Sequence, residues 1–469
     1  MPPEVGVTPS AVPRRNRQSV ALRDDLTLRQ QVWLLAKWPL LEQFMAFFVG
    51  LVDTALAGRL PTEAVHATNA MGVAAYVMWL MGLFQGAVGV GALALISRAV
   101  GARHRREANA ALGQSLTIAV IWGSIMATVF VIIAPVFGWV FGLEPRAHEM
   151  STLYLRLLAA MIPFMAILFV GSACLRGAGD TRSPFMVMGV VNIVNITVSL
   201  LLVIGPAPIG GHGVAGIAIG TMAAWAVGAF LMIALLLRGR GGLKLHLHRL
   251  RPHKRMTHRI IRISWPNLAE SLMFWIGNAV VVYVVGHLPQ ANAMGAHVIA
   301  IRIEALSFLP GFAFGQAAAT MAGQYLGAGN PQGAKKAVWV CWSYGAAVMS
   351  SLGILFILIP QPFVWVMTDQ PTFLDQAPTL LVICGFAQIG FGTAMILAGA
   401  LRGAGDTRTT MLLNFASTYI VRLPLVWFMG VTLEWGLVGV WIALSLELTV
   451  RGLLFLARFL HGGWQHVKV

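Results

Sequence analysis

The chain has 469 residues, of which 58% are hydrophobic and 11% are charged, and this balance excludes an ordinary soluble globular protein. Apolar stretches of about 20 residues recur along nearly its whole length, and each is long enough to cross a hydrocarbon core of roughly 30 Å as a helix. The formal net charge of +16 is distributed over alternate loops, so we do not expect a nucleic-acid-binding protein.

The first segment, residues 1–30, is polar and basic. Arg14, Arg15 and Arg17 precede the first apolar run, and the positive-inside rule then keeps the N-terminus in the cytoplasm. The segment lacks the short apolar core and cleavage site of a signal peptide, so we expect a retained cytoplasmic tail.

The later loops follow the same rule. Basic residues fall in the even-numbered loops, above all at 238–262, whereas Glu63 and Glu144 fall in odd-numbered ones. The two classes of loop therefore lie on opposite sides of the bilayer. We predict a multi-pass protein of the cytoplasmic (inner) membrane with both termini in the cytoplasm.

The continuously apolar runs predict an all-α integral membrane protein with twelve spans, because β-barrel strands would be shorter and alternating. The polar stretch at 238–259 divides the spans six and six. The predicted spans are 33–60, 65–100, 107–141, 147–175, 183–205, 213–238, 260–287, 292–326, 336–367, 374–400, 410–432 and 437–460. The predicted units are a tail at 1–30, a first lobe at 31–238, a loop at 239–258, a second lobe at 259–461 and a tail at 462–469.

The first predicted span contains two carboxylates, Glu42 and Asp53. A carboxylate within a membrane helix is costly and is a functional candidate by default. The two residues are eleven positions apart, so they project from nearly the same face, about 16 Å apart along the axis. For Glu42 a solvated position near the cytoplasmic end is the alternative.

The fifth span carries Asn192, Asn195 and Ser199 at i, i+3 and i+7, which places them on one helix face. Their neutral oxygens could serve a proton-carrying carboxyl or a Na⁺ ion. Ordinary hydrogen bonds between helices are the alternative interpretation.

Arginines also occur within the spans. Arg156 and Arg422, in spans four and eleven, would form salt bridges between the lobes or contact substrate. Arg302 and Glu304 are two residues apart in span eight, hence about 200° apart, and cannot pair with each other. Each of the two needs a partner elsewhere.

An internal repeat relates the two halves. CLRGAGDTR at 174–182 recurs as ALRGAGDTR at 400–408, an offset of 226, and at an offset of 228 Glu42 falls on Glu270. Each half has an even number of spans, so the repeats share one orientation about an axis along the membrane normal. Two such lobes leave a central cavity that rocking opens to alternate sides, as in a transporter.

Other charged residues receive structural assignments. We expect Glu447 and Arg451, four apart on one helix, to pair. Asp180 and Asp406, in the two repeated turns, should cap the following helices and pair with Arg182 and Arg408 respectively.

The repeated LRGAGDTR, the segment GLVDTALAGRL at 50–60 and RISWPNLAESLMFW at 262–275 together resemble the multidrug and toxic compound extrusion (MATE) transporters, in particular their DinF-like branch. The resemblance implies a V-shaped twelve-helix fold, export of cationic or amphipathic compounds in exchange for H⁺ or Na⁺, and an ion-coupling role for Asp53. Asn195 and Thr221 match the polar partners of such a site, and Glu270 matches the glutamate of the seventh helix.

Two departures from the family bear on the coupling ion. Ser199 occupies the position where DinF-like members often have a second Asp, which weakens the case for a two-carboxylate relay. Na⁺-coupled members usually carry an acid in the tenth span, but no Asp or Glu lies between Asp375 and Asp406. The second-lobe candidates, Glu270 and Glu304, would then form an incomplete Na⁺ site, which favours H⁺.

Our leading hypothesis is therefore an H⁺-coupled multidrug antiporter in which Asp53 titrates within a pocket completed by Asn192, Asn195 and Thr221. In the alternative, the same site binds a Na⁺ ion at Asp53 and Asn195. We expect no cofactor and no other metal. The expected partners are small organic substrates and membrane lipids, and we expect a monomer.

Two rival functions make different demands on the sequence. A lipid-linked oligosaccharide flippase of the same superfamily would need several cations in its cavity for a pyrophosphate headgroup. A membrane-embedded enzyme would need a metal or nucleophile constellation within the spans, and the sequence contains no obvious one.

Overall fold

The computed structural model describes residues 22–23, 25–58, 60, 64–206, 209–290, 292–467 and 469, without the side chains of 47 and 51. Most of the predicted tail, with Arg14, Arg15 and Arg17, lies outside these residues, and so does Glu63. The described chain is helical and contains no β-sheet, only one isolated bridge between Arg240 and Leu243.

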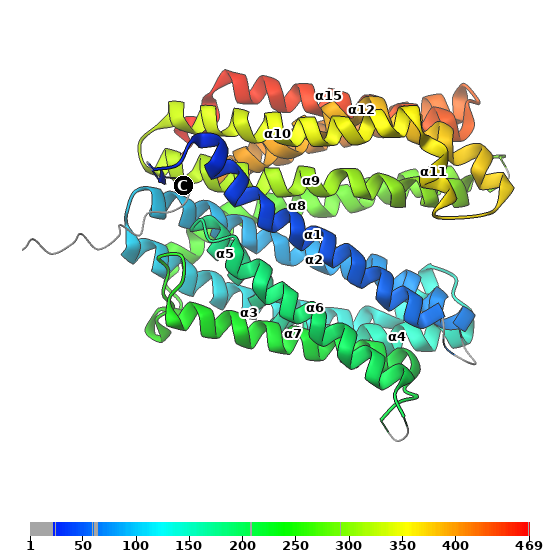
Figure 1. Cartoon of the computed structure of the whole chain (residues 1–469), viewed down its shortest axis with the longest axis horizontal. Coiled ribbons are helices and arrows are strands. Elements are labelled where there is room, and N and C mark those ends of the chain that lie inside the picture. Colours follow the sequence, from blue (N-terminus) through cyan, green and yellow to red (C-terminus); the bar gives the residue numbers. More distant parts are fainter. Residues whose placement is uncertain are drawn as a thin grey trace, which may run out of the picture.

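Seven helices precede the long central loop (Figure 1). They are α1 (Leu28–Gly58), α2 (Ala64–Gly101), α3 (Arg105–Val140), α4 (Pro145–Ala160), α5 (Ile162–Gly177), α6 (Arg182–Ile204) and α7 (Gly213–Arg238).

The second half begins after the short 3₁₀ turn η2 (Leu247–Leu250). Its helices are α8 (Lys254–Gly286), α9 (Ala293–Gly327), α10 (Pro331–Leu358), α11 (Pro360–Trp365), α12 (Pro371–Ala404), α13 (Thr407–Phe415), η3 (Ala416–Arg422), α14 (Leu423–Trp427), η4 (Phe428–Thr432), α15 (Gly436–His461) and η5 (Gly463–His466).

The prediction of an all-α membrane protein with twelve spans is confirmed, with one span bent. Eleven of the described helical segments are long and apolar enough to cross a membrane, and α4 with α5 makes a twelfth that bends by 56°. The break lies at Met161, two residues before Pro163, which cannot donate a backbone hydrogen bond to the preceding turn.

The eleventh span also departs from a regular α-helix. Its segments η3 and η4 are π-helical, and they flank the short α14, in which Pro424 interrupts the backbone hydrogen bonding. π-Helical turns are uncommon and often mark functional or strained positions. Arg422, a sequence-predicted candidate, is the last residue of η3.

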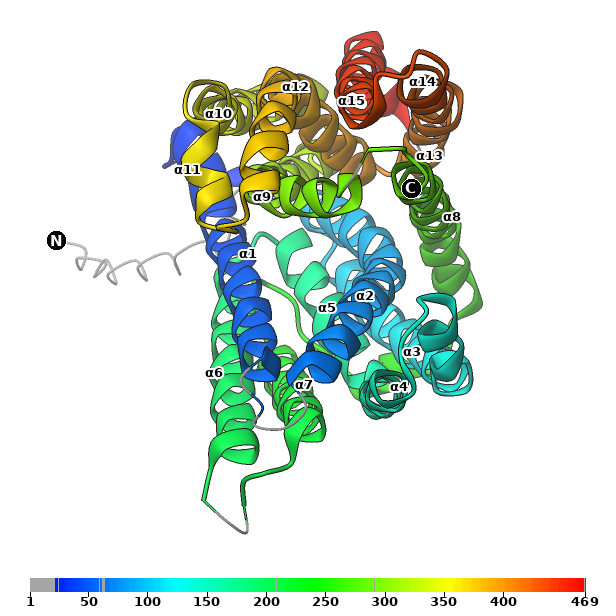
Figure 2. The same ribbon diagram turned by 90° about the vertical axis from the view of Figure 1, so that its right-hand side faces the viewer.

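Two bundles lie side by side, and the first helix of each leans across the other (Figures 1 and 2). Val32 and Leu35, in the first part of α1, are buried among residues of α9, α10 and α12, whereas Leu56 packs with α2 and α4. In the same way Ile260 of α8 packs with the first lobe and Val284 with the second. The lobe bounds 31–238 and 259–461 divide the chain by sequence order. That each of these ranges packs as a separate unit stays a prediction.

One end of the molecule carries the loops at 102–104, 239–253 and 328–330, and we call it the basic end. There α2 and α9 cross without room for side chains: a Cβ on Gly101 would clash with the carbonyl of Gln324, one on Gly323 with Ser97, and one on Gly327 with the backbone of Arg98. At the basic end the two lobes are therefore in direct backbone contact.

Reciprocal hydrogen bonds reinforce this crossing. Nε2 of Gln324 in α9 donates to the carbonyl of Gly177 at 2.8 Å, and Nη2 of Arg98 in α2 donates to the carbonyl of Ala404 at 2.9 Å. Gln324 and Arg98 are separated by the repeat offset of 226 residues and their acceptors by one residue more, so the two lobes make closely equivalent contacts to each other. We call the glycine crossing and these bonds the seam.

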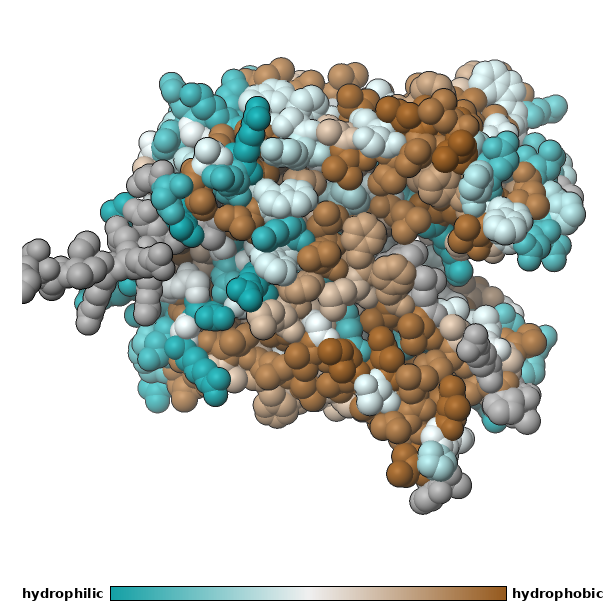
Figure 3. Space-filling model, viewed as in Figure 1, coloured by the Kyte–Doolittle hydropathy of each residue, from teal (hydrophilic) through white to brown (hydrophobic). Residues whose placement is uncertain are grey.

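The opposite end is open. Figure 3 shows a notch between the two lobes at the end away from the seam, and a broad apolar surface along both lobes. The two lobes thus meet at the basic end and diverge from it, which confirms the expected V shape.

The seam predicts that substitutions of two glycines on α2 change the stability of the protein by different amounts. Gly101→Ala should lower the free energy of unfolding by about 1–3 kcal/mol, because the added methyl group overlaps the backbone of α9. Gly86→Ala is the matched control, since no atom lies within 4 Å of a Cβ at that position. Thermal unfolding of the purified protein in detergent measures both. Equal stability of the two variants would contradict the close crossing.

Candidate functional site

Asp53 lies in the C-terminal half of α1, away from the basic end, without an ion-pair partner among the described residues. Its side chain is half-buried, and its Oδ1 is shielded from solvent and accepts no hydrogen bond. A buried polar atom without a partner calls for an explanation, such as a bound proton, ion or water. Asp53 is thus an acid whose charge no described residue neutralises.

A short chain of hydrogen bonds stands beside Asp53. Tyr154 of α4 interacts electrostatically with Asp53 and shares a hydrogen bond with Thr221 of α7. Nδ2 of Asn195 in α6 donates to Oγ1 of Thr221 at 2.9 Å, and Thr221 donates to the carbonyl of Ile217 at 3.2 Å. Four helices therefore meet around one carboxyl group.

Asn192 and Ser199 lie on the same buried face of α6 as Asn195, as the spacing predicted. Their polar side-chain atoms, Nδ2 of Asn192 and Oγ of Ser199, have no hydrogen-bond partner among the described residues, and neither does Oδ1 of Asn195. No direct hydrogen bond joins them to Asp53. We call Asp53, Tyr154, Asn192, Asn195, Ser199 and Thr221 the first-lobe pocket.

Tyr154 is the pocket residue that the sequence reasoning missed. It is the one tyrosine of α4, three residues after Ser151 and two before Arg156. The signal that could have found it is its small polar hydroxyl at membrane depth, since a buried hydroxyl needs a hydrogen-bond partner.

Glu42, by contrast, is neutralised. Nη2 of Arg176 donates to its Oε1 at 2.6 Å, and both side chains are largely buried. Arg176 belongs to the first copy of LRGAGDTR. The expected alternative of a solvated Glu42 at the end of the helix is therefore wrong.

Glu270 has the equivalent partner in the second half. It pairs with Arg402, from the second copy of LRGAGDTR, and also accepts a hydrogen bond from Nδ2 of Asn414 at 2.7 Å. The repeat thus builds the same Glu–Arg pair twice. A Glu270 held by an arginine is already neutralised, which argues against a cation site at this residue.

Arg422 and Glu447 form the centre of a buried network in the second lobe. Arg422 donates to Oε2 of Glu447 at 2.7 Å, and Arg451 donates to Oε1 at 2.7 Å. Ser417 also donates to Glu447, and Nη1 of Arg422 reaches Asn278 at 3.4 Å. The predicted Glu447–Arg451 pair is confirmed, whereas the predicted interlobe partner for Arg422 is wrong, because all its partners lie in the second half.

Arg302 and Glu304 point in opposite directions, as their spacing required. Glu304 faces the interior of the second lobe, where it shares a hydrogen bond with Cys384 of α12 and lies in the electrostatic field of Arg422. Arg302 is exposed, and no hydrogen bond or ion pair joins it to another described residue. Arg156 is also exposed and donates only to the carbonyl of Val131 at 3.4 Å. Since Val131 belongs to the same lobe, Arg156 forms no interlobe salt bridge.

Of the two repeated turns, the first caps the following helix through its Asp and the second makes no such cap bond, and neither Asp has the arginine partner that was expected. Asp180 accepts hydrogen bonds from the backbone and hydroxyl of Ser183, at 3.0 and 2.7 Å. Asp406 accepts from Thr409 but pairs with Arg458 of α15 at 2.8 Å, and not with Arg408. The expected pairing of Asp180 with Arg182 does not form either.

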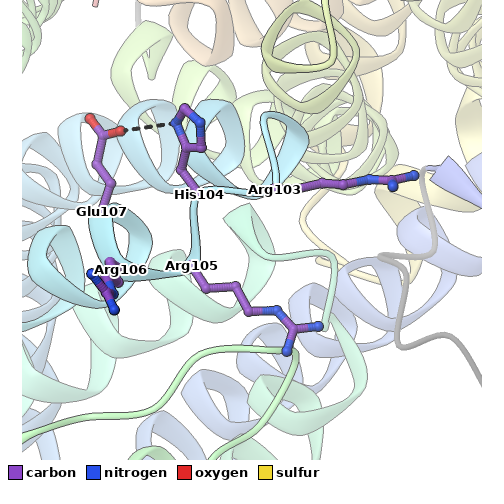
Figure 4. Close-up of a pocket in the computed structure, with 5 residues that line it drawn as sticks. All are labelled: Arg103, His104, Arg105, Arg106 and Glu107. Atoms are coloured by element: carbon purple, nitrogen blue, oxygen red, sulfur yellow. Dashed lines mark ion pairs between the residues drawn. The ribbon is translucent and has the colours of Figure 1, made fainter. Parts of the chain in front are cut away.

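A shallow pocket at the basic end is made of the turn between α2 and α3, with Arg103, His104, Arg105, Arg106 and Glu107 (Figure 4). Nδ1 of His104 lies 3.7 Å from Glu107, which also pairs with Arg259 at 2.7 Å. The arginines project apart, so the turn offers no convergent site. Within the part of the chain that the structure describes, no three His, Cys, Asp or Glu side chains gather as metal ligands.

Comparison with known proteins gives a consistent result. The family model MatE matches residues 40–201 and 266–428, once in each half. The probable multidrug resistance protein NorM of Thermotoga maritima is 27% identical over 438 residues, which cover 93% of each protein. A FAD transporter of Shewanella oneidensis is 25% identical over 387 residues, 80% of this chain and 82% of that one.

Solved structures share the fold. A multidrug resistance MATE family transporter of the MOP superfamily in an outward-facing conformation superposes with a TM-score of 0.84 at 19% identity, covering 93% of this chain and 95% of that one. A MOP superfamily transporter from Pyrococcus furiosus, described as having a binding pocket of reverse polarity, gives 0.85 at 18% identity, covering 94% and 97%.

The Glu42–Arg176 pair predicts a non-additive effect on stability. Arg176→Met alone should lower the free energy of unfolding by about 3–5 kcal/mol, because it leaves a buried carboxylate without a partner. Adding Glu42→Gln should restore part of that loss. Denaturant unfolding of the two single variants and the double variant measures the coupling, and Glu270→Gln with Arg402→Met should behave alike. Strictly additive losses would show that the pair contributes no interaction energy.

Proposed function

The chain belongs to the MatE family of membrane transporters, and on that premise we propose that it exports organic compounds in exchange for an inward-moving proton. The members of this family are transporters and not enzymes. The observation that carries the proposal is Asp53, an intramembrane acid without a fixed cationic partner.

The neighbours of Asp53 support a titrating role. Tyr154, Thr221 and Asn195 offer hydroxyl and amide groups but no positive charge. The carboxylate is therefore neutralised only when it takes up a cation from solution, either H⁺ or Na⁺. A proton bound from one side and released to the other, as the lobes rock, would couple the gradient to transport.

The choice of H⁺ over Na⁺ rests on the scarcity of carboxylates. Ser199 takes the place of a second acid in the pocket, and Glu270 is occupied by Arg402. A Na⁺ ion would have to rely on Asp53 and neutral oxygens such as Oδ1 of Asn195, which is the alternative form of the same proposal.

The substrates and setting complete the proposal. We propose small organic, amphipathic substrates that bind in the notch between the lobes, and a monomer embedded in lipid of the inner membrane. The basic end would face the cytoplasm, as the positive-inside rule requires. The notch would then open outward in the state described above.

The first test is the removal of the titrating group. Asp53→Asn should fold and insert normally but lose proton-driven dye export in everted vesicles, because an amide cannot exchange a proton. Asp53→Glu keeps a carboxyl and should retain part of the activity. Asp180→Asn, which alters a helix cap and not the pocket, is the matched control. Full gradient-driven transport by Asp53→Asn would refute the assignment.

The second test identifies the coupling ion. Purified protein in liposomes receives either a pH gradient or a Na⁺ gradient of equal size, with dye accumulation as the readout. We expect accumulation with the pH gradient alone. Accumulation with Na⁺ alone would assign Asp53 and Asn195 to a Na⁺ site. Translocation of a lipid-linked oligosaccharide without dye transport would instead favour the flippase function.

A further inference from the structure

The direction of Arg302 can be read from the helix that carries it. Thr320 lies 18 residues, or five turns, further along α9, so the two side chains leave the helix in the same direction. Oγ1 of Thr320 donates to the carbonyl of Arg176 in the first lobe at 3.0 Å. At Thr320, beyond Pro310, this face of α9 thus looks toward the first lobe, whereas a Cβ on Gly295, seven residues before Arg302, would meet Phe373 of α12.

Glu304 gives an independent check of this direction. It lies about 200° around the helix from Arg302 and contacts Cys384 of α12, inside the second lobe. Arg302 must therefore point out of the second lobe, consistent with its exposure. Figure 2 shows α9 on the side of the second lobe that faces the first.

The depth of Arg302 places it inside the notch. It lies nine residues from the outer end of α9 at Ala293, roughly 13 Å below that end. Deeper on the same face, Leu309 and Ala313 are buried, with 6% and 0% exposure. The open part of this face ends about two turns below Arg302, so the guanidinium stands just above the floor of the notch.

No carboxylate among the residues that the structure describes forms an ion pair with Arg302. Glu42, Glu270 and Glu447 are each held by an arginine of their own. Glu304 faces the other way, and Asp53 belongs to the pocket of the first lobe. An arginine at membrane depth is costly unless water or an anion reaches it.

The chemistry of the side chain selects its ligand. A guanidinium presents a planar fork of donors that matches a carboxylate or a phosphate. An apolar stripe of Ile301, Phe308 and Phe312 lies on the adjoining side of α9, about 80–120° around the helix from Arg302. Ile301 and Phe312 in this stripe are 41% and 46% exposed. A ligand with an anionic group and an apolar body would satisfy both features.

We propose that Arg302 forms an anion-binding subsite in the notch and that the exported compounds include organic anions bearing a carboxylate or phosphate next to an apolar or aromatic body. This inference rests on the proposed export function and departs from the family expectation of cationic substrates. It concerns binding, which needs no ion gradient, and so it can be tested apart from the coupling mechanism.

The experiment compares two xanthene dyes, anionic fluorescein and cationic rhodamine 6G, by fluorescence polarisation with the full chain in phosphatidylcholine nanodiscs. Arg302→Gln should weaken fluorescein binding by about tenfold or more and leave rhodamine 6G binding unchanged or tighter. Arg302→Lys should retain part of the fluorescein affinity. Arg408→Gln, at an exposed arginine near the start of α13, is the matched control and should behave as wild type.

Three results would overturn the subsite. The first is equal fluorescein affinity in wild type and Arg302→Gln. The second is an equal loss for both dyes, which would indicate a general defect of the notch. The third concerns the source of the anion. If Arg302→Gln reduces the amount of phosphatidylglycerol that is retained after purification but does not reduce fluorescein affinity, Arg302 binds a lipid headgroup and not a substrate.

Failure of the coupling mechanism has a different signature. If Arg302-dependent fluorescein binding is intact but neither dye is moved by any gradient in liposomes, the export function falls and the anion subsite stands. If dyes are exported and Asp53→Asn abolishes export, but Arg302→Gln leaves fluorescein affinity unchanged, the export function stands and the anion subsite falls.

Discussion

An ionised group within a membrane must find an opposite charge or remain in contact with water. Most of the architecture described here answers that requirement. Glu42 and Glu270 are each met by the arginine of a repeated octapeptide, and Glu447 is met by two arginines. With these charges compensated, Asp53 and two exposed arginines, Arg156 and Arg302, have no ion pair among the described residues, and we propose roles for Asp53 and Arg302.

These two groups lie on different lobes and would have different tasks. Asp53 is surrounded by hydroxyl and amide groups and suits an ion that comes and goes. In our proposal Arg302 stands above the floor of the notch, where a larger molecule would enter. Placing the proposed coupling acid and the proposed anion-binding cation on different lobes would prevent them from neutralising each other.

Much of the fold and of the candidate site could be read from the sequence. The contacts that could not be read share one cause. Hydropathy located the spans, and the repeat placed Glu42 and Glu270 at equivalent positions. The repeat did not identify Arg176 and Arg402 as their partners, because 134 and 132 residues separate the members of each pair and nothing local joins them. Tyr154 escaped for the same reason, and Asp406 was given the nearby Arg408 when the fold supplies Arg458. Helical spacing gave the correct prediction where the relation involved residues of one helix alone, as for the opposite directions of Arg302 and Glu304.

The crossed first helices have a consequence for how the molecule can be divided. Because the basic-end portion of α1 is buried in the second bundle and that of α8 in the first, the chain has the arrangement of a swapped dimer whose two subunits are fused. A fragment ending at Arg238 would expose the apolar surface on which the first part of α8 packs. The first part of its α1 would also lack the second-bundle residues that bury it. Neither half is then expected to fold as a monomer; two such fragments would have to exchange their first helices to complete each other.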